Sequence, residues 1–144
     1  MKTTNFEYPY YKIPESVFPT NRCKGNNARR TLVLSEQKDF EENGPLLVKI
    51  LRAVELDFEQ DVSFILMQDG ETLSLLSTPE ISNYDNLILF GIKPMQVGLA
   101  SQKSSSLMRL ENLTIIVSGS LDKIIKDSNV KKDLWAQLKA VFKS

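Results

Sequence analysis

The sequence predicts a three-layer α/β domain with a mainly parallel sheet, and two observations carry that prediction. Short runs rich in Ile, Leu and Val alternate along the chain with segments whose apolar residues recur at helical spacing. One such run, residues 86–91, is almost entirely apolar, as expected of a central parallel strand buried on both faces. Strands that alternate with helices in this way are typical of parallel strands joined by helical crossovers.

The predicted strands are short and end in residues that favour turns. They comprise residues 30–35, 62–67, 86–91, 107–110 (an edge strand) and 113–117. A polar, acidic loop is expected at 36–43, and Gly44-Pro45 then begins a helix that runs to about Leu56. Short helices are expected at 93–99 and, from a more ambiguous pattern, within 71–81.

The last strand leads into a turn and two helices. In Ser118-Gly119-Ser120, Gly119 can adopt a positive φ and Ser120 can cap a short helix. That helix places Leu121, Ile124 and Ile125 on one face, and Ser128-Asn129 breaks it and caps a second helix. The second helix has one apolar stripe, formed by Val130, Leu134, Trp135, Leu138, Val141 and Phe142. Trp135 is therefore interpreted as a core residue.

Length and composition predict a single domain of a soluble protein. The chain has 144 residues, of which 42% are hydrophobic and 25% charged, as in ordinary globular proteins. No window approaches the roughly 18 apolar residues of a membrane span, and the first residues lack the apolar region of a signal peptide. The single cysteine, Cys23, excludes an intramolecular disulfide and fits a reducing environment. We therefore expect a cytoplasmic protein with no membrane contact.

Residues 1–29 differ from the α/β domain expected at 30–144. Aromatic residues lie among three prolines in this segment, and prolines at such spacing favour an extended backbone. The segment is expected either to lie on the domain's own surface or to dock in a partner's groove as an extended peptide. Its candidate contacts are Tyr8, Tyr10, Tyr11 and Phe18.

Charge is distributed unevenly although the net charge is zero. The segment 31–90 holds three basic and twelve acidic residues, whereas 91–144 holds nine basic and four acidic residues. Residues 1–30 are also basic, with six basic and two acidic residues. These two basic ends could contact an acidic partner, although solvation of opposite faces is the simpler interpretation. On the last helix, Lys131, Lys132 and Lys139 are candidates for a protein contact.

Several kinds of chemistry are excluded by residues that the chain lacks. It has no histidine, so it contains no Ser-His-Asp triad, Cys-His dyad or histidine metal site. It has no glycine-rich nucleotide fingerprint, and we expect neither a metal nor a cofactor. Carboxylate chemistry remains open, because Glu36 follows the first strand and Asp69 the second. The simpler interpretation is that Glu36, Asp39, Glu41 and Glu42 are solvated loop charges.

Residues 118–135, with their small-residue turn, short helix and basic Leu-Trp helix, resemble the C-terminal signature of the psi subunit of bacterial DNA polymerase III. Residues 32–34 and 47–53 are similar to its first strand and its leucine-rich helix. The resemblance implies a uracil-DNA-glycosylase-like fold with a four-stranded parallel sheet flanked by helices. Active glycosylases carry a water-positioning side chain after the first strand and a histidine after the last. The corresponding turns here, Ser35-Glu36 and Ser118-Gly119-Ser120, lack those motifs, which implies a vestigial site without catalysis.

The resemblance also implies a role in joining proteins. The psi subunit docks on the clamp loader through an N-terminal peptide and binds the chi subunit through its domain. We therefore expect a non-catalytic interaction subunit whose partner is a clamp-loader or chi-like protein, with nucleic acid contacted only indirectly. Two alternatives remain open: a glycosylase-like enzyme or nucleic-acid-binding domain that uses Glu36 or Asp69, and a domain unrelated to either class.

Overall fold

The computed structural model describes residue 19 and residues 22–99 and 106–142. Five strands form one mixed sheet in the order β3-β2-β4-β6-β5, in which β3, β2, β4 and β6 run parallel. The strands are β2 (Thr31–Glu36), β3 (Val62–Met67), β4 (Asn86–Phe90), β5 (Ser106–Leu110) and β6 (Leu113–Ser118). The predicted α/β class with a mostly parallel sheet is confirmed.

The expected count of four strands is wrong, because β5 adds a fifth strand that runs antiparallel to β6. Only two residues, Glu111 and Asn112, separate β5 from β6, and Glu111 has a φ of 53°. So short a connection can join only antiparallel neighbours, since a parallel pair needs a crossover of a dozen or more residues. The edge strand expected at 107–110 is therefore present as one arm of a hairpin.

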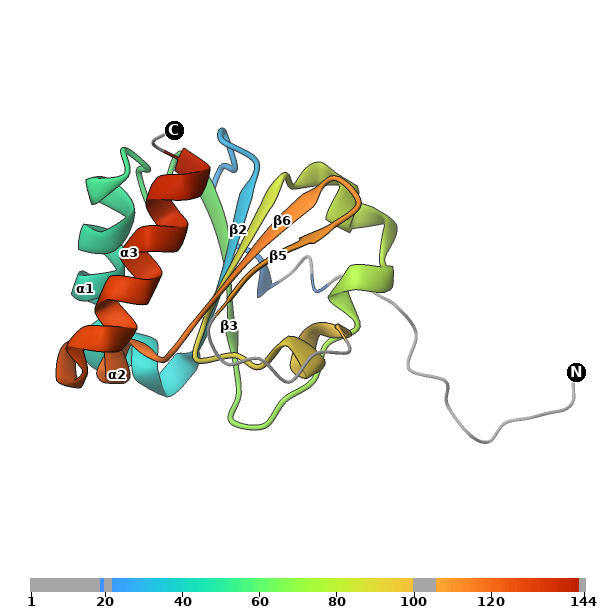
Figure 1. The fold of residues 1–144 in the computed structure, drawn as a ribbon. Coiled ribbons are helices and arrows are strands. Elements are labelled where there is room, and N and C mark those ends of the chain that lie inside the picture. Colours follow the sequence, from blue (N-terminus) through green and yellow to red (C-terminus); the bar gives the residue numbers. More distant parts are fainter. Residues whose placement is uncertain (1–18, 20–21, 100–105, 143–144) are drawn as a thin grey trace, which may run out of the picture.

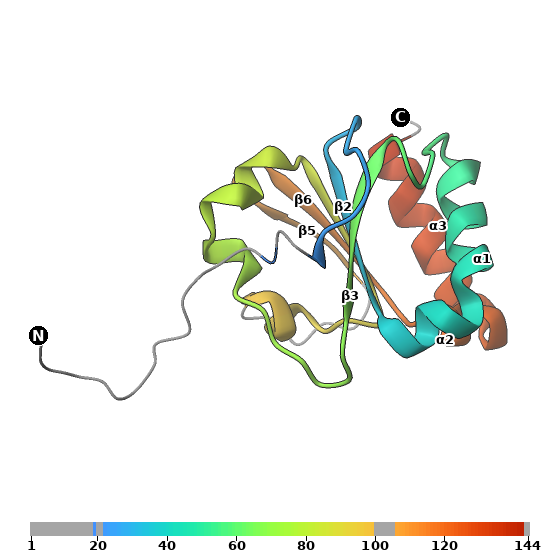
Figure 2. The same cartoon turned by 180° about the vertical axis from the view of Figure 1, so that it is seen from behind.

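The layers on the two faces of the sheet differ in kind (Figure 1). On one face lie α1 (Gln37–Ala53), α2 (Leu121–Lys126) and α3 (Ser128–Phe142), as the reverse view also shows (Figure 2). The other face is covered by three 3₁₀ helices, η2 (Leu75–Ser77), η3 (Pro79–Asn83) and η4 (Pro94–Val97). The predicted αβα arrangement is therefore wrong for one face, which carries 3₁₀ helices in place of α-helices. Thr78 and Lys93, each followed by proline, are both extended, which prevents a continuous α-helix there.

Two apolar cores lie on the two faces of the sheet. Successive strand residues point to opposite faces, so Leu32 and Leu34 pack toward the 3₁₀ helices while Val33 packs toward the α-helices. The central strand β4 contributes fully buried side chains to both cores, including Leu89 and Phe90. The central position of β4 explains why residues 86–91 are almost entirely apolar.

Helix α1 begins at Gln37, so the prediction of a loop at 36–43 is wrong. The segment before Pro45 is helical and is joined to the rest of α1 by a kink at Asn43, whose φ is −127°. Proline lacks the N–H that would continue the ladder, which accounts for a kink rather than a straight helix. Phe40 on the first segment stacks on Phe58 and Phe64, with ring centroids 5.8 and 5.9 Å away.

The β3 edge of the sheet is covered by residues 22–29, the end of the predicted arm. The N–H of Lys24 donates to the carbonyl of Phe64 at 3.0 Å, and the N–H of Phe64 donates back at 2.8 Å. Gly25 has a φ of 98°, and a Cβ there would lie 2.2 Å from the carbonyl oxygen of Val62, so only glycine permits this approach. Residues 1–18 and 20–21 lie outside the described residues.

Helices α2 and α3 follow the predicted pattern with three differences. Asp127, not Ser128-Asn129, forms the break, and its Oδ1 accepts from the N–H of Asn129 at 2.9 Å. Ile125, expected on the inner face of α2, is 59% exposed. Trp135 is half-buried rather than enclosed, because it lies at the margin of the stripe whose centre is Leu134 and Leu138. Within the described ranges, no helix combines the length and the apolar character needed to span a bilayer.

Candidate functional site

The carboxyl ends of β2, β4 and β6 form the edge where an α/β sheet usually holds a ligand. The chain leaves β2 toward β3 through α1, on one face, and leaves β4 in the opposite direction through η4, on the other. Ligands bind outside the carboxyl ends of strands at such a reversal. The predicted site residues after β2 and β6 do lie at this edge.

Ser35 and Ser118 are buried on either side of Phe90. The three residues are in register on neighbouring strands, and therefore point to the same face of the sheet. Their exposed fractions are 1%, 3% and 0%, respectively. The hydroxyl of Ser35 donates to the carbonyl of Glu36 at 3.3 Å, while the Ser118 hydroxyl has no partner within the described part of the chain. Both serines thus lie beneath the helices and are not open to solvent.

The turn between β6 and α2 is occupied by a carboxylate of the chain itself. Asp39, on α1, accepts from the N–H of Leu121 at 2.7 Å through Oδ2 and from the N–H of Asp122 at 3.2 Å through Oδ1. The hydroxyl of Ser120 accepts from the N–H of Lys123 at 3.1 Å, which confirms the predicted cap. The N–H groups that an anion would use at this turn are therefore already bonded.

The position of Asp39 differs from the one that the sequence predicts. The residue was expected to be a solvated loop charge, but it is 9% exposed and also accepts from the Nδ2 of Asn43 at 3.1 Å. Its partner Leu121 is 82 residues away along the chain, so no local pattern marks the contact.

Gly119 serves close packing rather than an unusual backbone angle. Its φ does not lie in the left-handed region, contrary to the expectation. A Cβ at this position would instead lie 3.1 Å from Cγ1 of Val130 and 3.4 Å from Cβ of Lys123. The turn therefore lies directly against the first residues of α3.

A small cavity of about 180 Å³ opens beside this turn, lined by Gly91, Lys93, Ser118, Gly119, Ser120 and Lys123 among others. Pockets that enclose drug-sized ligands usually measure about 300–1,000 Å³. The cavity is thus too small for a nucleoside-sized ligand, although its two lysines would tolerate a small anion.

Glu36 and Asp69 are brought together at the ends of β2 and β3. Partial burial raises the pKa of Glu36 above its usual value, and so do the charge of Asp69, a hydrogen bond to it and the charge of Asp39. A raised pKa next to a second carboxylate is a feature shared by general acids and by structural clusters. No three His, Cys, Asp or Glu side chains within the described residues are grouped so as to hold a metal ion.

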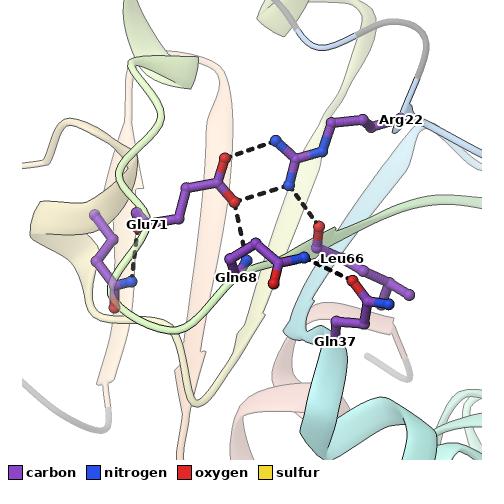
Figure 3. Close-up of polar contacts among 6 residues, drawn as sticks. Arg22, Gln37, Leu66, Gln68 and Glu71 are labelled. Carbon is purple, nitrogen blue, oxygen red and sulfur yellow. Dashed lines mark hydrogen bonds and ion pairs between the residues drawn. The ribbon is translucent and has the colours of Figure 1, made fainter.

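An ion pair fastens residue 22 to the loop after β3 (Figure 3). The guanidinium of Arg22 donates to both carboxylate oxygens of Glu71, at 2.6 and 2.8 Å, and to the carbonyl of Leu66 at 2.7 Å. The backbone N–H of Gln68 also donates to the carboxylate of Glu71, at 2.9 Å. The Nε2 of Gln68 donates to the Oε1 of Gln37 at 2.7 Å. The hydrogen bond from Arg22 lowers the pKa of Glu71 below its usual value. The start of the described chain is thereby held at the carboxyl edge.

The predicted partner contacts fall into two groups. Lys131, Lys132 and Lys139 are exposed on α3, and none forms an ion pair with another described residue. Tyr8, Tyr10, Tyr11 and Phe18 lie outside the described residues. The structure therefore brings the lysines onto one helix and the serines and carboxylates to the sheet edge.

No protein-family model matches this chain, and no curated protein matches it either. The function proposed below therefore rests on the residues and contacts described above.

Proposed function

We propose that this chain is a non-catalytic protein-interaction subunit on a glycosylase-like α/β scaffold, similar in role to the psi subunit of DNA polymerase III. The observation that carries the proposal is the contact of Asp39 with the N–H groups of Leu121 and Asp122. A catalytic turn at this position needs free donors or an accessible side chain to act on a substrate. Here the donors are bonded within the chain and Ser118 is buried.

The arrangement of the resembling segments supports the proposed scaffold. Residues 32–34 lie in β2, residues 47–53 in α1, and residues 118–135 run from the end of β6 into α3. These segments pack together through the core on the helical face of the sheet, which includes Val33, Leu47 and Leu134. Four strands of the sheet run parallel, as the resemblance implies, and the antiparallel β5 is an addition to them.

The surface of α3 supports a role in binding proteins. Lys131 and Lys132 lie on its first turns and Lys139 near its end, all exposed and without carboxylate partners among the described residues. Unpaired surface cations attract an acidic partner and raise its association rate. We expect the partner to be a clamp-loader or chi-like subunit, in contact with α3 and with the segment that precedes residue 22.

Co-purification tests this proposal. The full chain, tagged and expressed at native level in its source organism, should recover clamp-loader or chi-like subunits. Replacing Lys131 and Lys132 together by Glu should weaken the recovery, whereas Lys49→Glu, an exposed lysine on α1, should leave it unchanged. Repeated absence of replication subunits would overturn the assignment to the replication machinery.

The proximity of Glu36 and Asp69 favours a second candidate function, that of a glycosylase-like enzyme that uses a carboxylate. Excision of uracil from a single-stranded oligonucleotide by the purified chain, abolished by Glu36→Gln, would support this candidate. Oligonucleotide binding that weakens steeply with salt would support a nucleic-acid-binding role. Absence of excision together with absence of binding removes both.

A further inference from the structure

Strand β5 leaves one edge of the sheet open. Within the described ranges its only strand neighbour is β6, whereas residues 22–29 hydrogen-bond along β3 at the opposite edge. Natural proteins usually protect open edges with several charges, a proline or a bulge. In contrast, β5 exposes 45% of Leu107 and 38% of Leu110, and Arg109 is its single charged residue. The strand thus has the features of a template for another strand.

A groove lies beside this edge on the helical face of the sheet. Leu107 pairs with Ile116, a residue of the helical-face core, so Leu107 and Arg109 point toward the face that α3 covers. A groove of about 490 Å³ lies there, lined by Leu107, Arg109, Ala140 and Val141. Leu110 pairs with Leu113 of the other core, so it points to the opposite face, where 38% of it is exposed. Successive side chains of an extended peptide point to opposite faces, so every second residue of a strand paired with β5 would face this groove.

Arg109 ends a row of polar side chains at the open edge. Thr31, Asn86, Thr114 and Arg109 are in register across four strands, on one face. The Nδ2 of Asn86 donates to the hydroxyl of Thr31 at 3.3 Å, and Nη1 of Arg109 donates to the hydroxyl of Thr114 at 3.2 Å. No described carboxylate forms an ion pair with Arg109. A strand added to β5 would place its own side chain directly opposite this guanidinium.

We propose that β5 binds, by strand addition, an extended and largely apolar peptide of a partner protein with an acidic residue opposite Arg109. Backbone hydrogen bonds would supply affinity, and the groove and the charge pair would supply specificity. The proposal rests on the proposed function, because it names the surface by which the interaction subunit holds a partner.

A second copy of the chain fits this edge less well when the two β5 strands pair over their full length, about their central residue. Antiparallel pairing of two β5 strands about Met108 sets each Leu107 opposite the other strand's Arg109. The two guanidinium groups would then lie diagonally on the same face, within reach of each other, and like charges on neighbouring strands repel. An acidic peptide replaces that repulsion by attraction.

Peptide selection tests the proposal. A random heptapeptide library displayed on phage is selected against the full chain and against Arg109→Glu, with circular dichroism to verify that both are folded. The wild-type chain should select apolar peptides with Asp or Glu at one fixed position, and Arg109→Glu should select Lys or Arg there. The control Lys49→Glu, at an exposed lysine on α1 outside the groove, should keep the acidic preference. If Arg109→Glu does not fold, Arg109→Gln should lose the preference without reversing it.

Binding of one selected peptide, measured by fluorescence anisotropy, should weaken roughly tenfold in Arg109→Glu. Leu107→Lys, which places a charge in the helical-face groove, should weaken it as well. Selection of no peptides, or of the same peptides by Arg109→Glu, would overturn the proposal. So would a concentration-dependent dimer in sedimentation that Arg109→Glu strengthens or dissolves, because it would assign the edge to a second copy. Recovery of clamp-loader subunits by Arg109→Glu at wild-type level would leave the proposed function standing while this surface assignment fails.

Discussion

Asp39 joins two helices through a carboxylate that is almost fully buried. It accepts from two backbone N–H groups at the start of α2 and from the side chain of Asn43 on its own helix. Carboxylates near a helix N-terminus also interact favourably with the partial positive charge there. The residue is therefore structural, although it occupies a position where an enzyme would bind an anion.

Asp39→Ala should lower the free energy of unfolding by about 1–3 kcal/mol, because it leaves buried N–H groups without acceptors. The matched control is Glu42→Ala, an exposed acidic residue of the same helix, which should change stability by less than about 0.5 kcal/mol. Urea unfolding of both variants provides the measurement. Equal stability of the two variants would show that the Asp39 contacts contribute nothing.

The Arg22–Glu71 pair should make stability depend on pH in the acidic range. Because the folded state lowers the pKa of Glu71, the pair stabilises the fold above the usual carboxyl value and loses that contribution as the pH falls through the lowered pKa. Glu71→Gln should therefore be less stable than wild type at pH 7, by roughly 0.5–1 kcal/mol for a partly exposed pair. Unfolding curves from pH 7 to pH 3 should show this difference shrinking toward acid pH. A constant difference would contradict the ion-pair explanation.

Ionised Glu36 should affect the free energy of unfolding in the opposite direction to Glu71. Its pKa is raised in the folded state by burial and by Asp69, so ionised Glu36 destabilises the fold at neutral pH. Glu36→Gln should raise the free energy of unfolding at pH 7 by roughly 0.5 kcal/mol. The gain should disappear as the pH falls through the raised pKa, where wild-type Glu36 becomes protonated. A variant that loses stability at pH 7 would indicate that the carboxylate makes a favourable contact instead.

At the residue scale, local patterns predicted local contacts and missed distant ones. The cap at Ser120 could be predicted, because its acceptor and donor lie three residues apart. Asp39 could not, since its donors come from another helix far along the chain. Glu36 and Asp69 were each recognised after a strand, but only the parallel pairing of β2 with β3 places them side by side.

At the scale of elements, the turn between β6 and α2 packs closely against α3 because Gly119 has no side chain. Gly119→Ala should reduce stability by about 1 kcal/mol, because the added methyl group would lie 3.1 Å from Cγ1 of Val130 and force that side chain to shift. Val130→Ala in the same chain should recover part of that loss, giving a favourable coupling energy. Thermal or urea unfolding of the two single variants and the double variant measures the coupling. Strict additivity would mean that the close contact with Val130 does not limit position 119.

The existence of the strands and of α1 and α3 followed from periodicity, whereas helix type and helix starts did not. Gly44-Pro45 predicts the start of α1, yet the helix begins seven residues earlier than Gly44, at Gln37. Phe40 in this first segment stacks on Phe58 and Phe64, which come from other segments of the chain. On the other face, prolines at 79 and 94 limit the connections to 3₁₀ helices. Tertiary packing therefore determines where α1 begins, and proline geometry determines the helix type on the other face. Apolar spacing alone predicts neither.

At the scale of the whole molecule, the two edges of the sheet are treated differently. The chain covers β3 with its own residues 22–29 and leaves β5 with apolar side chains and a single arginine at the surface. The hairpin that makes β5 antiparallel was predictable as an edge strand, but its exposure depends on the strand order, which periodicity does not encode. Among the described residues, the carboxyl edge is closed by internal hydrogen bonds while β5 has a strand neighbour on one side alone, and the proposed binding role rests on this contrast.

The central claim, that the chain acts by binding a replication protein, is tested most directly by isothermal titration calorimetry. The purified full chain is titrated with purified clamp-loader and chi-like subunits of its source organism. The account predicts saturable binding to one of them, unchanged by Glu36→Gln because that carboxylate has no part in the interaction. Absence of binding to every subunit would contradict it.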